Sequence, residues 1–120
     1  SSADNAVYAI NGAGWATASL GTGTAVYQDL THLHGPLDIV RAPNGHLIVA
    51  NSDGSNVNPN QPSELVEFTT DGTFVAEYPV DQNNGGAFGL ALTRLSPTAV
   101  KFAAVDDNAN TLSIFEETQY

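Results

Sequence analysis

Short apolar segments that alternate with clusters of turn-forming residues are the feature that most limits what this 120-residue chain can fold into. The segments are rich in Val, Ile, Leu, Phe and Tyr and end at Gly, Asn, Asp, Ser or Pro, which is the pattern of β-strands. No stretch keeps a 3.6-residue apolar period over a dozen residues, so we expect almost no helix. The pattern predicts an all-β fold with strands at Ala6–Ile10, Thr24–Tyr27, Leu37–Val40, Leu47–Ala50, Leu65–Phe68, Phe74–Val80, Phe88–Leu92, Val100–Val105 and Leu112–Phe115.

Two dipeptides predict hairpins between neighbouring strands. Asn44-Gly45 lies between the third and fourth predicted strands, and Asp71-Gly72 lies between the fifth and sixth. Both dipeptides can supply the positive φ angles of a tight type I′ turn. We therefore expect an antiparallel meander with type I′ turns at these two positions.

The segments also repeat along the chain. Residues 35–40 and residues 86–92 share one pattern, in which Gly precedes an apolar strand, and residues 47–53 and 102–107 share another. A period of about 40–50 residues with four strands in each unit is typical of the blades of a β-propeller. The alternative fold on this pattern is a small meander sandwich.

The repeat divides the chain into parts of three blades, with strands named A to D from the central channel outward. Residues 1–34 provide strands C and D of a preceding blade and a connection, residues 35–85 a complete blade, and residues 86–120 strands A to C of the last blade. This is a partial β-propeller of about two blades. We expect it to belong to a six-bladed ring that other polypeptide completes, and closure by several copies of the chain is the alternative.

Charge and composition exclude several function classes. Thirteen acidic residues against three basic ones give a formal net charge of −10. A nucleic-acid backbone binder needs clustered positive charge, so we expect no nucleic-acid partner. No apolar run approaches the roughly 20 residues of a membrane-spanning helix, so we expect no membrane insertion. The chain has no cysteine, which excludes disulfides and thiolate metal sites.

Two segments are candidate metal sites. His32 and His34 are separated by one residue, so on an extended chain their side chains point the same way and could share a metal ion. Asp53 opens a polar loop, residues 53–60, with side-chain oxygens at alternating positions that suit Ca²⁺. The alternative role of the histidines is loop packing, and the alternative role of the aspartate is to stabilise its own turn.

Residues 35–51, followed by residues 65–72, resemble an NHL repeat. That family's pattern runs from a Pro-led strand through an Asn-Gly or Asp-Gly turn to a strand ending in Ala-Asn, and closes on Asp-Gly. The segment from Phe88 to Leu112 is similar to the last blade of secreted bacterial NHL-type proteins. The resemblance implies a propeller and an extracellular or periplasmic location. It leaves the function open, because NHL-like propellers include binding scaffolds, lactonases, strictosidine-synthase-like enzymes and zinc lyases.

The resemblance adds two residues to the candidate metal ligands. In lactonase-like propellers a divalent cation lies in the channel, and Asp38 and Asn51 are expected to face that channel here. A zinc lyase would need three channel histidines, and this sequence offers no third histidine at a matching position.

We expect a non-catalytic binding or structural scaffold, because the chain has no nucleophile elbow, phosphate loop or zinc-protease motif. Its partners would be the remaining blades or other copies of the chain, together with a protein or carbohydrate ligand, for which Trp15 is a candidate platform. One alternative is a fragment of a metal-dependent lactonase or lyase that uses Ca²⁺ or another divalent cation. The other is a self-assembling unit that closes by strand exchange between copies.

Overall fold

A computed structural model describes residues 5–52 and 58–118. In these residues nine strands form three antiparallel sheets, and the all-β prediction is confirmed. One short 3₁₀ helix, η1 (Ala13–Trp15), lies between the first two strands. The strands are β1 (Ala6–Ala9), β2 (Thr24–Gln28), β3 (Pro36–Arg41), β4 (Leu47–Asn51), β5 (Glu64–Phe68), β6 (Phe74–Pro79), β7 (Ala87–Ser96), β8 (Ala99–Asp106) and β9 (Thr111–Thr118).

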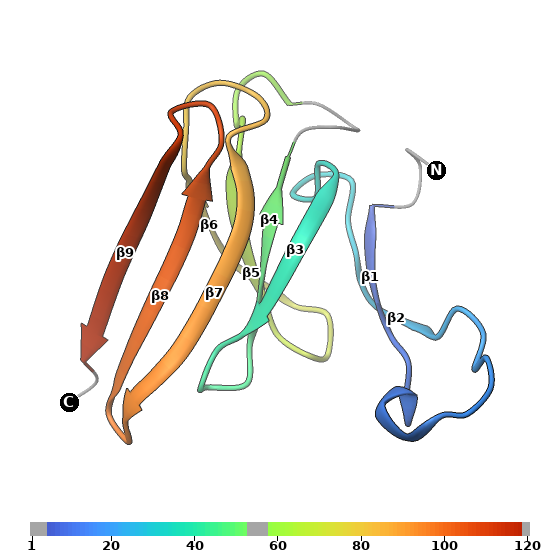
Figure 1. Cartoon of the computed structure of the whole chain (residues 1–120). Coiled ribbons are helices and arrows are strands. Elements are labelled where there is room, and N and C mark those ends of the chain that lie inside the picture. Colours follow the sequence, from blue (N-terminus) through green and yellow to red (C-terminus); the bar gives the residue numbers. More distant parts are fainter. Residues whose placement is uncertain (1–4, 53–57, 119–120) are drawn as a thin grey trace.

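The three sheets follow one another along the chain. The first sheet contains β1 and β2, the middle sheet has the order β3-β4-β5-β6, and the third sheet has the order β7-β8-β9. Figure 1 shows the middle sheet between the other two, with the strand axes of all three sheets roughly aligned. No helix in the part of the chain that the structure describes is long and apolar enough to cross a membrane.

The hairpins fall where the sequence predicts them, but the prediction of type I′ turns is wrong. A type I′ turn needs positive φ at both central residues, and here Gly45 (φ 92°) and Gly72 (φ 91°) are positive while Asn44 and Asp71 are not. The N–H of Gly45 bonds the carbonyl of Ala42, and the N–H of Gly72 bonds that of Thr69. Each hairpin is therefore a type I turn followed by a left-handed glycine, the arrangement of longer hairpin loops.

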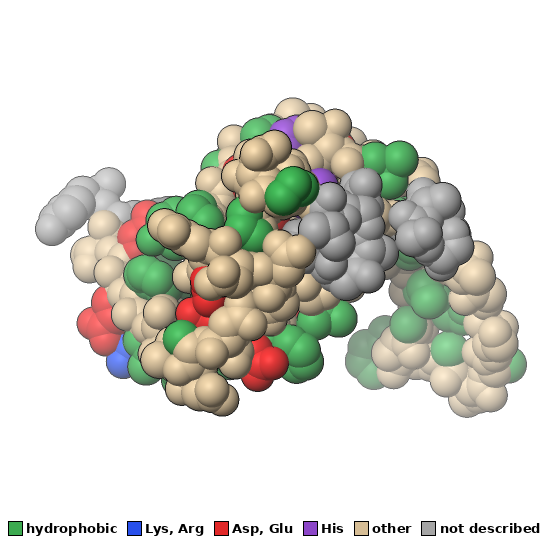
Figure 2. Space-filling view, turned by 90° about the horizontal axis from the view of Figure 1, so that it is seen from above, with side chains coloured by type: hydrophobic (Ala, Val, Ile, Leu, Met, Phe, Trp, Pro, Cys, Tyr) green, Lys and Arg blue, Asp and Glu red, His purple; other side chains and the backbone are tan. Residues whose placement is uncertain are grey.

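The connections divide between the two ends of the strands. The β2–β3, β6–β7 and β8–β9 connections and residues 58–63 before β5 lie together at the upper end in Figure 1, and the β1–β2, β3–β4, β5–β6 and β7–β8 turns lie at the lower end. Figure 2 looks down on the upper end, where red carboxylates occur in several places and blue appears only at one margin. We call this upper end the rim.

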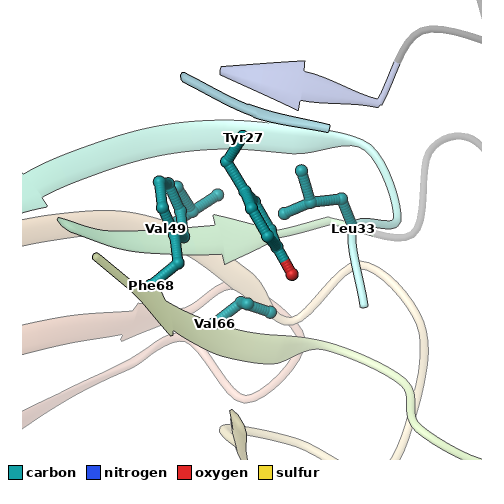
Figure 3. Packing of buried hydrophobic residues seen from close by; sticks show 5 residues of the cluster. All are labelled: Tyr27, Leu33, Val49, Val66 and Phe68. Carbon is teal, nitrogen blue, oxygen red and sulfur yellow. The ribbon is translucent and has the colours of Figure 1, made fainter. Parts of the chain in front are cut away.

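One apolar layer joins the first sheet to the middle sheet. Tyr27 from β2 stacks on Phe68 from β5, with ring centroids 4.4 Å apart, and Val49, Val66 and Leu33 complete the buried cluster. Figure 3 shows these five side chains converging between the two sheets. Leu33 comes from the β2–β3 connection, so this layer also fixes the position of that connection.

A second layer joins the middle sheet to the third. Its buried members are Ala50, Leu65, Ala87 and Ala104. Three of these residues are alanines, and their small side chains let β7 pack closely against β3 and β4. In β4 the residues alternate between the two layers, because Val49 belongs to the first and Ala50 to the second. This alternation explains why β4 is apolar at successive positions.

Coverage of the middle sheet is incomplete on the side of β3. Leu37 and Ile39 are 53% and 43% exposed, although the neighbouring β4 is largely buried. The first sheet has two strands in the described residues and packs mainly over β4 and β5, so it leaves these two side chains of β3 uncovered.

Candidate functional site

The β2–β3 connection is organised around the carboxylate of Asp29. Its Oδ2 accepts hydrogen bonds from Oη of Tyr27 at 2.6 Å and from Nδ1 of His32 at 2.5 Å. Its Oδ1 accepts the backbone N–H of Thr31 at 2.6 Å and that of His32 at 3.2 Å. The ring of His32 then stacks on Phe74 of β6, with centroids 3.9 Å apart. Asp29 therefore ties the connection to both β2 and the middle sheet.

These contacts shift the pKa of both acidic partners. Burial by itself raises the pKa of Asp29, but the hydrogen bonds from Tyr27, His32 and the two backbone N–H groups stabilise the carboxylate and hold its pKa well below the usual value. For Tyr27, burial is the largest cause that raises the pKa of the hydroxyl. The hydrogen bond to Asp29 and the negative charge of Asp29 raise it further. Together they raise the pKa of the Tyr27 hydroxyl well above its usual value.

His34 faces the interior of the same connection. It is 3% exposed, and its Nε2 bonds the carbonyl oxygen of Thr31 at 3.0 Å. Its backbone N–H donates to Oδ1 of Asn51 at 3.1 Å, and Nδ2 of Asn51 donates to the carbonyl of His32 at 2.6 Å. The buried amide of Asn51, at the end of β4, therefore clamps the chain on either side of Leu33.

The structure brings Asn51 of β4 against the connection that carries His32 and His34, but it does not point the two rings at a shared position. Because the connection turns back on itself, one ring bonds Asp29 and the other bonds a backbone carbonyl. Asp53 lies outside the described residues. Within them, no group of three or more His, Asp or Glu side chains is placed to hold a metal ion.

Asp38 has a contact that the sequence does not indicate. Its Oδ1 accepts the N–H of Ile39 at 2.8 Å, and its Oδ2 accepts the N–H of Leu90 at 2.7 Å. Leu90 belongs to β7, so the carboxylate links the first strand of the middle sheet to the first strand of the third sheet. Charge-assisted hydrogen bonds of this kind are among the stronger ones in proteins.

A repeated contact, in which a polar side chain accepts the backbone N–H of a glycine, joins each sheet to the next. Sequence reasoning missed this junction. Oδ1 of Asn5, just before β1, accepts the N–H of Gly35 at 2.9 Å. Oγ of Ser63, just before β5, accepts the N–H of Gly86 at 2.7 Å. In both cases the side chain of a polar residue just before a strand of one sheet accepts the N–H of the glycine that precedes the first strand of the next sheet.

Further backbone bonds repeat with this junction. The N–H of Asp29 bonds the carbonyl of Asn5 at 3.3 Å, and the N–H of Val80 bonds the carbonyl of Ser63 at 2.9 Å. Beyond each glycine, the N–H of Ser52 bonds the carbonyl of Gly35 at 3.1 Å, and that of Asp107 bonds the carbonyl of Gly86 at 2.9 Å. A polar residue just before one strand, followed later in the chain by Gly just before another strand, is the sequence signal that could have found this junction.

A cleft opens between the outer strands of the middle and third sheets, with a volume of about 330 Å³. An adjoining hollow of about 270 Å³ continues it toward the lower turns and adds Arg94 and Glu117 to the lining. The walls of the larger part are mostly apolar. We call this larger part the outer cleft; its lining residues are Ile48, Leu65, Glu67, Ala76, Glu77, Tyr78, Phe102 and Phe115.

Trp15 and His46 lie outside the β2–β3 connection, and His46 reaches the lining of the outer cleft through Glu67. Trp15, the candidate carbohydrate platform, is 91% exposed in η1. His46 follows the β3–β4 turn, at the end of the sheets opposite His32, and its Nδ1 bonds Oε1 of Glu67 at 2.6 Å.

Comparisons with known proteins give no relative for this chain: no family model matches it, and no curated protein and no solved structure matches it.

Proposed function

We propose that this chain is a non-catalytic binding scaffold and forms part of an extracellular or periplasmic NHL-like β-propeller. The observation that carries the proposal is the repeated junction, in which Asn5 holds Gly35 and Ser63 holds Gly86. Because this junction recurs with the sequence repeat, it supports the same relative arrangement for each pair of successive sheets, as expected for propeller blades. The resemblance of residues 35–51 to an NHL repeat supports the same proposal.

The rim is the surface that such a scaffold would present. Its loops are held in place from within: Nδ2 of Asn58 donates to Oε1 of Gln61 at 3.1 Å, and Nδ2 of Asn108 donates to the carbonyls of Asn83 and Asn84 at 3.2 and 3.0 Å. Loops that are ordered before binding lose less conformational entropy when a partner docks. Amide and carbonyl groups suit a hydrogen-bonding partner such as a protein loop or a carbohydrate.

Three of the side chains first considered as metal ligands make structural contacts within the chain. His32 bonds Asp29, His34 bonds the Thr31 carbonyl, and Asp38 caps Leu90. Each contact stabilises a connection or a junction, so these residues have a structural task in the scaffold without a metal ion.

Native mass spectrometry of the protein isolated from its source, followed by denaturing mass spectrometry of the same sample, tests the proposal. We expect this sequence to accompany further β-rich polypeptide, on the same chain or on a second one. A stable native species that contains the 12.5 kDa chain and nothing else contradicts the proposal.

Metal titration separates the scaffold from a metal-dependent enzyme. For the scaffold, the melting temperature should change by less than about 1 °C on addition of EDTA, Ca²⁺ or Zn²⁺ at millimolar concentration, because a ligand that does not bind the native state does not stabilise it. A rise of several degrees that His32→Gln abolishes favours the enzyme.

A further inference from the structure

We infer that the hollow between the lower turns of the middle and third sheets binds a small zwitterion, a free α-amino acid with an apolar side chain. The inference rests on the proposed binding role and adds a ligand site at the end of the molecule opposite the rim. We call this hollow, which adjoins the outer cleft, the lower hollow. Its volume of about 270 Å³ is close to the lower limit of about 300 Å³ for small-molecule sites, so it favours a compact ligand.

Both walls of the lower hollow belong to sheets that the structure describes. One wall comes from the β3–β4 turn, β4 and β5, and the other comes from β7, the β7–β8 turn, β8 and β9. Both turns lie at the lower end in Figure 1. The site is therefore bounded without any further strand beside β9.

Arg94 and Glu117 place opposite charges on either side of the lower hollow. Arg94 of β7 and Glu117 of β9 both lie directly across from Val100 of β8, so the three residues form one row on one face of the third sheet. All three residues line the hollow. Two strand spacings of about 4.8 Å separate the backbones of Arg94 and Glu117. The two charged side chains therefore flank a gap over Val100.

Neither Arg94 nor Glu117 forms an ion pair within the described residues. Glu67 also lines the lower hollow, but its Oε1 is bonded to Nδ1 of His46 at 2.6 Å. A ligand carboxylate can bind the guanidinium of Arg94 through two parallel hydrogen bonds, and a ligand ammonium group can bind Glu117.

The combination of the two charges indicates a zwitterion. A ligand with only a carboxylate would be repelled by Glu117, and a ligand with only an ammonium group would be repelled by Arg94. With a hydrogen bond of about 2.9 Å at each end, the gap leaves room for both groups on one carbon atom. That arrangement is the head of a free α-amino acid.

An apolar row beside these charges determines which side chain the ligand carries. Leu92, Phe102 and Phe115 lie two residues away from the charged row along their strands, directly across from one another and on the same face. The ring centroids of Phe102 and Phe115 are 6.1 Å apart. Ile48 of β4 lines the hollow from the other wall. An aliphatic or aromatic side chain of the ligand would be stabilised here by burial of apolar surface.

L-Leucine is the probe, and isothermal titration calorimetry of the protein measures its binding. We expect saturable binding with a dissociation constant of about 1 mM or below. Leucinamide lacks the carboxylate, 4-methylpentanoate lacks the ammonium group, and glycine lacks the apolar side chain, and we expect each to bind at least fivefold more weakly. No saturable binding of L-leucine at tenfold that concentration, or an analogue that binds as tightly as L-leucine, overturns the inference.

Substitutions assign the two charges to their partners on the ligand. Arg94→Gln should weaken binding of L-leucine at least fivefold and abolish the discrimination against leucinamide. Glu117→Gln should do the same for L-leucine and 4-methylpentanoate. Both residues are exposed, so these substitutions should leave the melting temperature unchanged.

Each substitution has a matched control. Arg41→Gln changes another arginine at the lower end, which does not line the lower hollow, and Glu116→Gln changes the neighbour of Glu117 on the opposite face of β9. We expect each control to change the affinity for L-leucine less than twofold. Equal effects of a variant and its control overturn the proposed site.

The native mass spectrum that tests the proposed scaffold does not depend on this ligand. Absence of L-leucine binding therefore overturns the ligand site alone, whereas a native species that contains only the 12.5 kDa chain contradicts the scaffold.

Discussion

The backbone N–H of Gly86 donates a 2.7 Å hydrogen bond to Oγ of Ser63, and this contact fastens the third sheet to the middle one. Ser63 is fully buried and has a left-handed backbone with φ of 54°. Its hydroxyl also donates to the carbonyl of Asn83 at 2.5 Å. One side chain thus satisfies two backbone groups of the β6–β7 connection, at the position where Asn5 holds Gly35 in the preceding sheet.

Ser63→Ala should destabilise the protein by about 1–3 kcal/mol, because it leaves the buried N–H of Gly86 without this partner. Ser63→Gly loses the same hydrogen bonds but removes the Cβ that disfavours a left-handed backbone by roughly 1–2 kcal/mol. Urea unfolding should therefore rank the wild type above Ser63→Gly and Ser63→Gly above Ser63→Ala. An alanine variant as stable as the wild type would show that the junction contributes nothing.

Gly86→Ala should also destabilise, since a Cβ there would lie 2.7 Å from Cβ of Asp81 and 3.1 Å from Oδ1 of Asp106. Crowding of this kind in a packed region typically costs about 1–3 kcal/mol. Gly14→Ala is the matched control, because nothing lies within 4 Å of its added methyl group, and its effect should stay within about 0.5 kcal/mol. Thermal unfolding of both variants gives the comparison, and equal melting temperatures would contradict the close contact at Gly86.

Phe68→Ala should cost about 3–5 kcal/mol, because the fully buried ring stacks on Tyr27 and anchors the layer between the first and middle sheets. Phe88→Ala is the control, with a ring that is 50% exposed, and should cost well below half as much. We also expect Phe68→Ala to speed amide exchange in β1 and β2 more than in β8. Uniformly faster exchange in all three sheets would instead indicate that they unfold together.

Asp29 should make stability depend on pH at the acidic end. Its pKa is lowered in the folded state, so its contribution is fully present above the unfolded value of about 3.9 and is lost as pH falls through the lower folded pKa. At pH 7 Asp29→Asn should therefore be less stable than the wild type, and the difference should shrink below about pH 4.

Urea unfolding between pH 7 and pH 2 measures this difference. Asp107→Asn, at an exposed position in the β8–β9 connection, is the control and should show little difference at either end of the range. A difference between Asp29→Asn and the wild type that persists unchanged to pH 2 would contradict a stabilising carboxylate at Asp29.

The strands were predictable because their signals are local. All nine predicted segments overlap an observed strand, since alternating apolar residues and turn-forming residues act over a few positions. The turn type was not predictable from Asn-Gly and Asp-Gly alone, because the hairpin loop length decides whether the glycine is a central residue of the turn or the residue that follows it.

The candidate site was predictable only in part. Sequence reasoning selected His32, His34 and Asn51, and Asn51 of β4 does bond the backbone of both histidines, but sequence reasoning treated the histidines as a pair on an extended chain. It did not include Asp29, whose contacts to Tyr27 and His32 turn that chain back on itself. No local pattern shows that a carboxylate will meet a particular hydroxyl and imidazole, because that depends on the turn between them.

By itself the sequence determined the all-β class, the places of the strands and the order of their hairpins, because strand propensity and turn chemistry depend on neighbours along the chain. Only the tertiary structure decided how the sheets are joined. The contacts of Ser63 with Gly86 and of Asp38 with Leu90 span 23 and 52 residues. Such contacts form when distant segments exclude water together, and no window of sequence contains both partners.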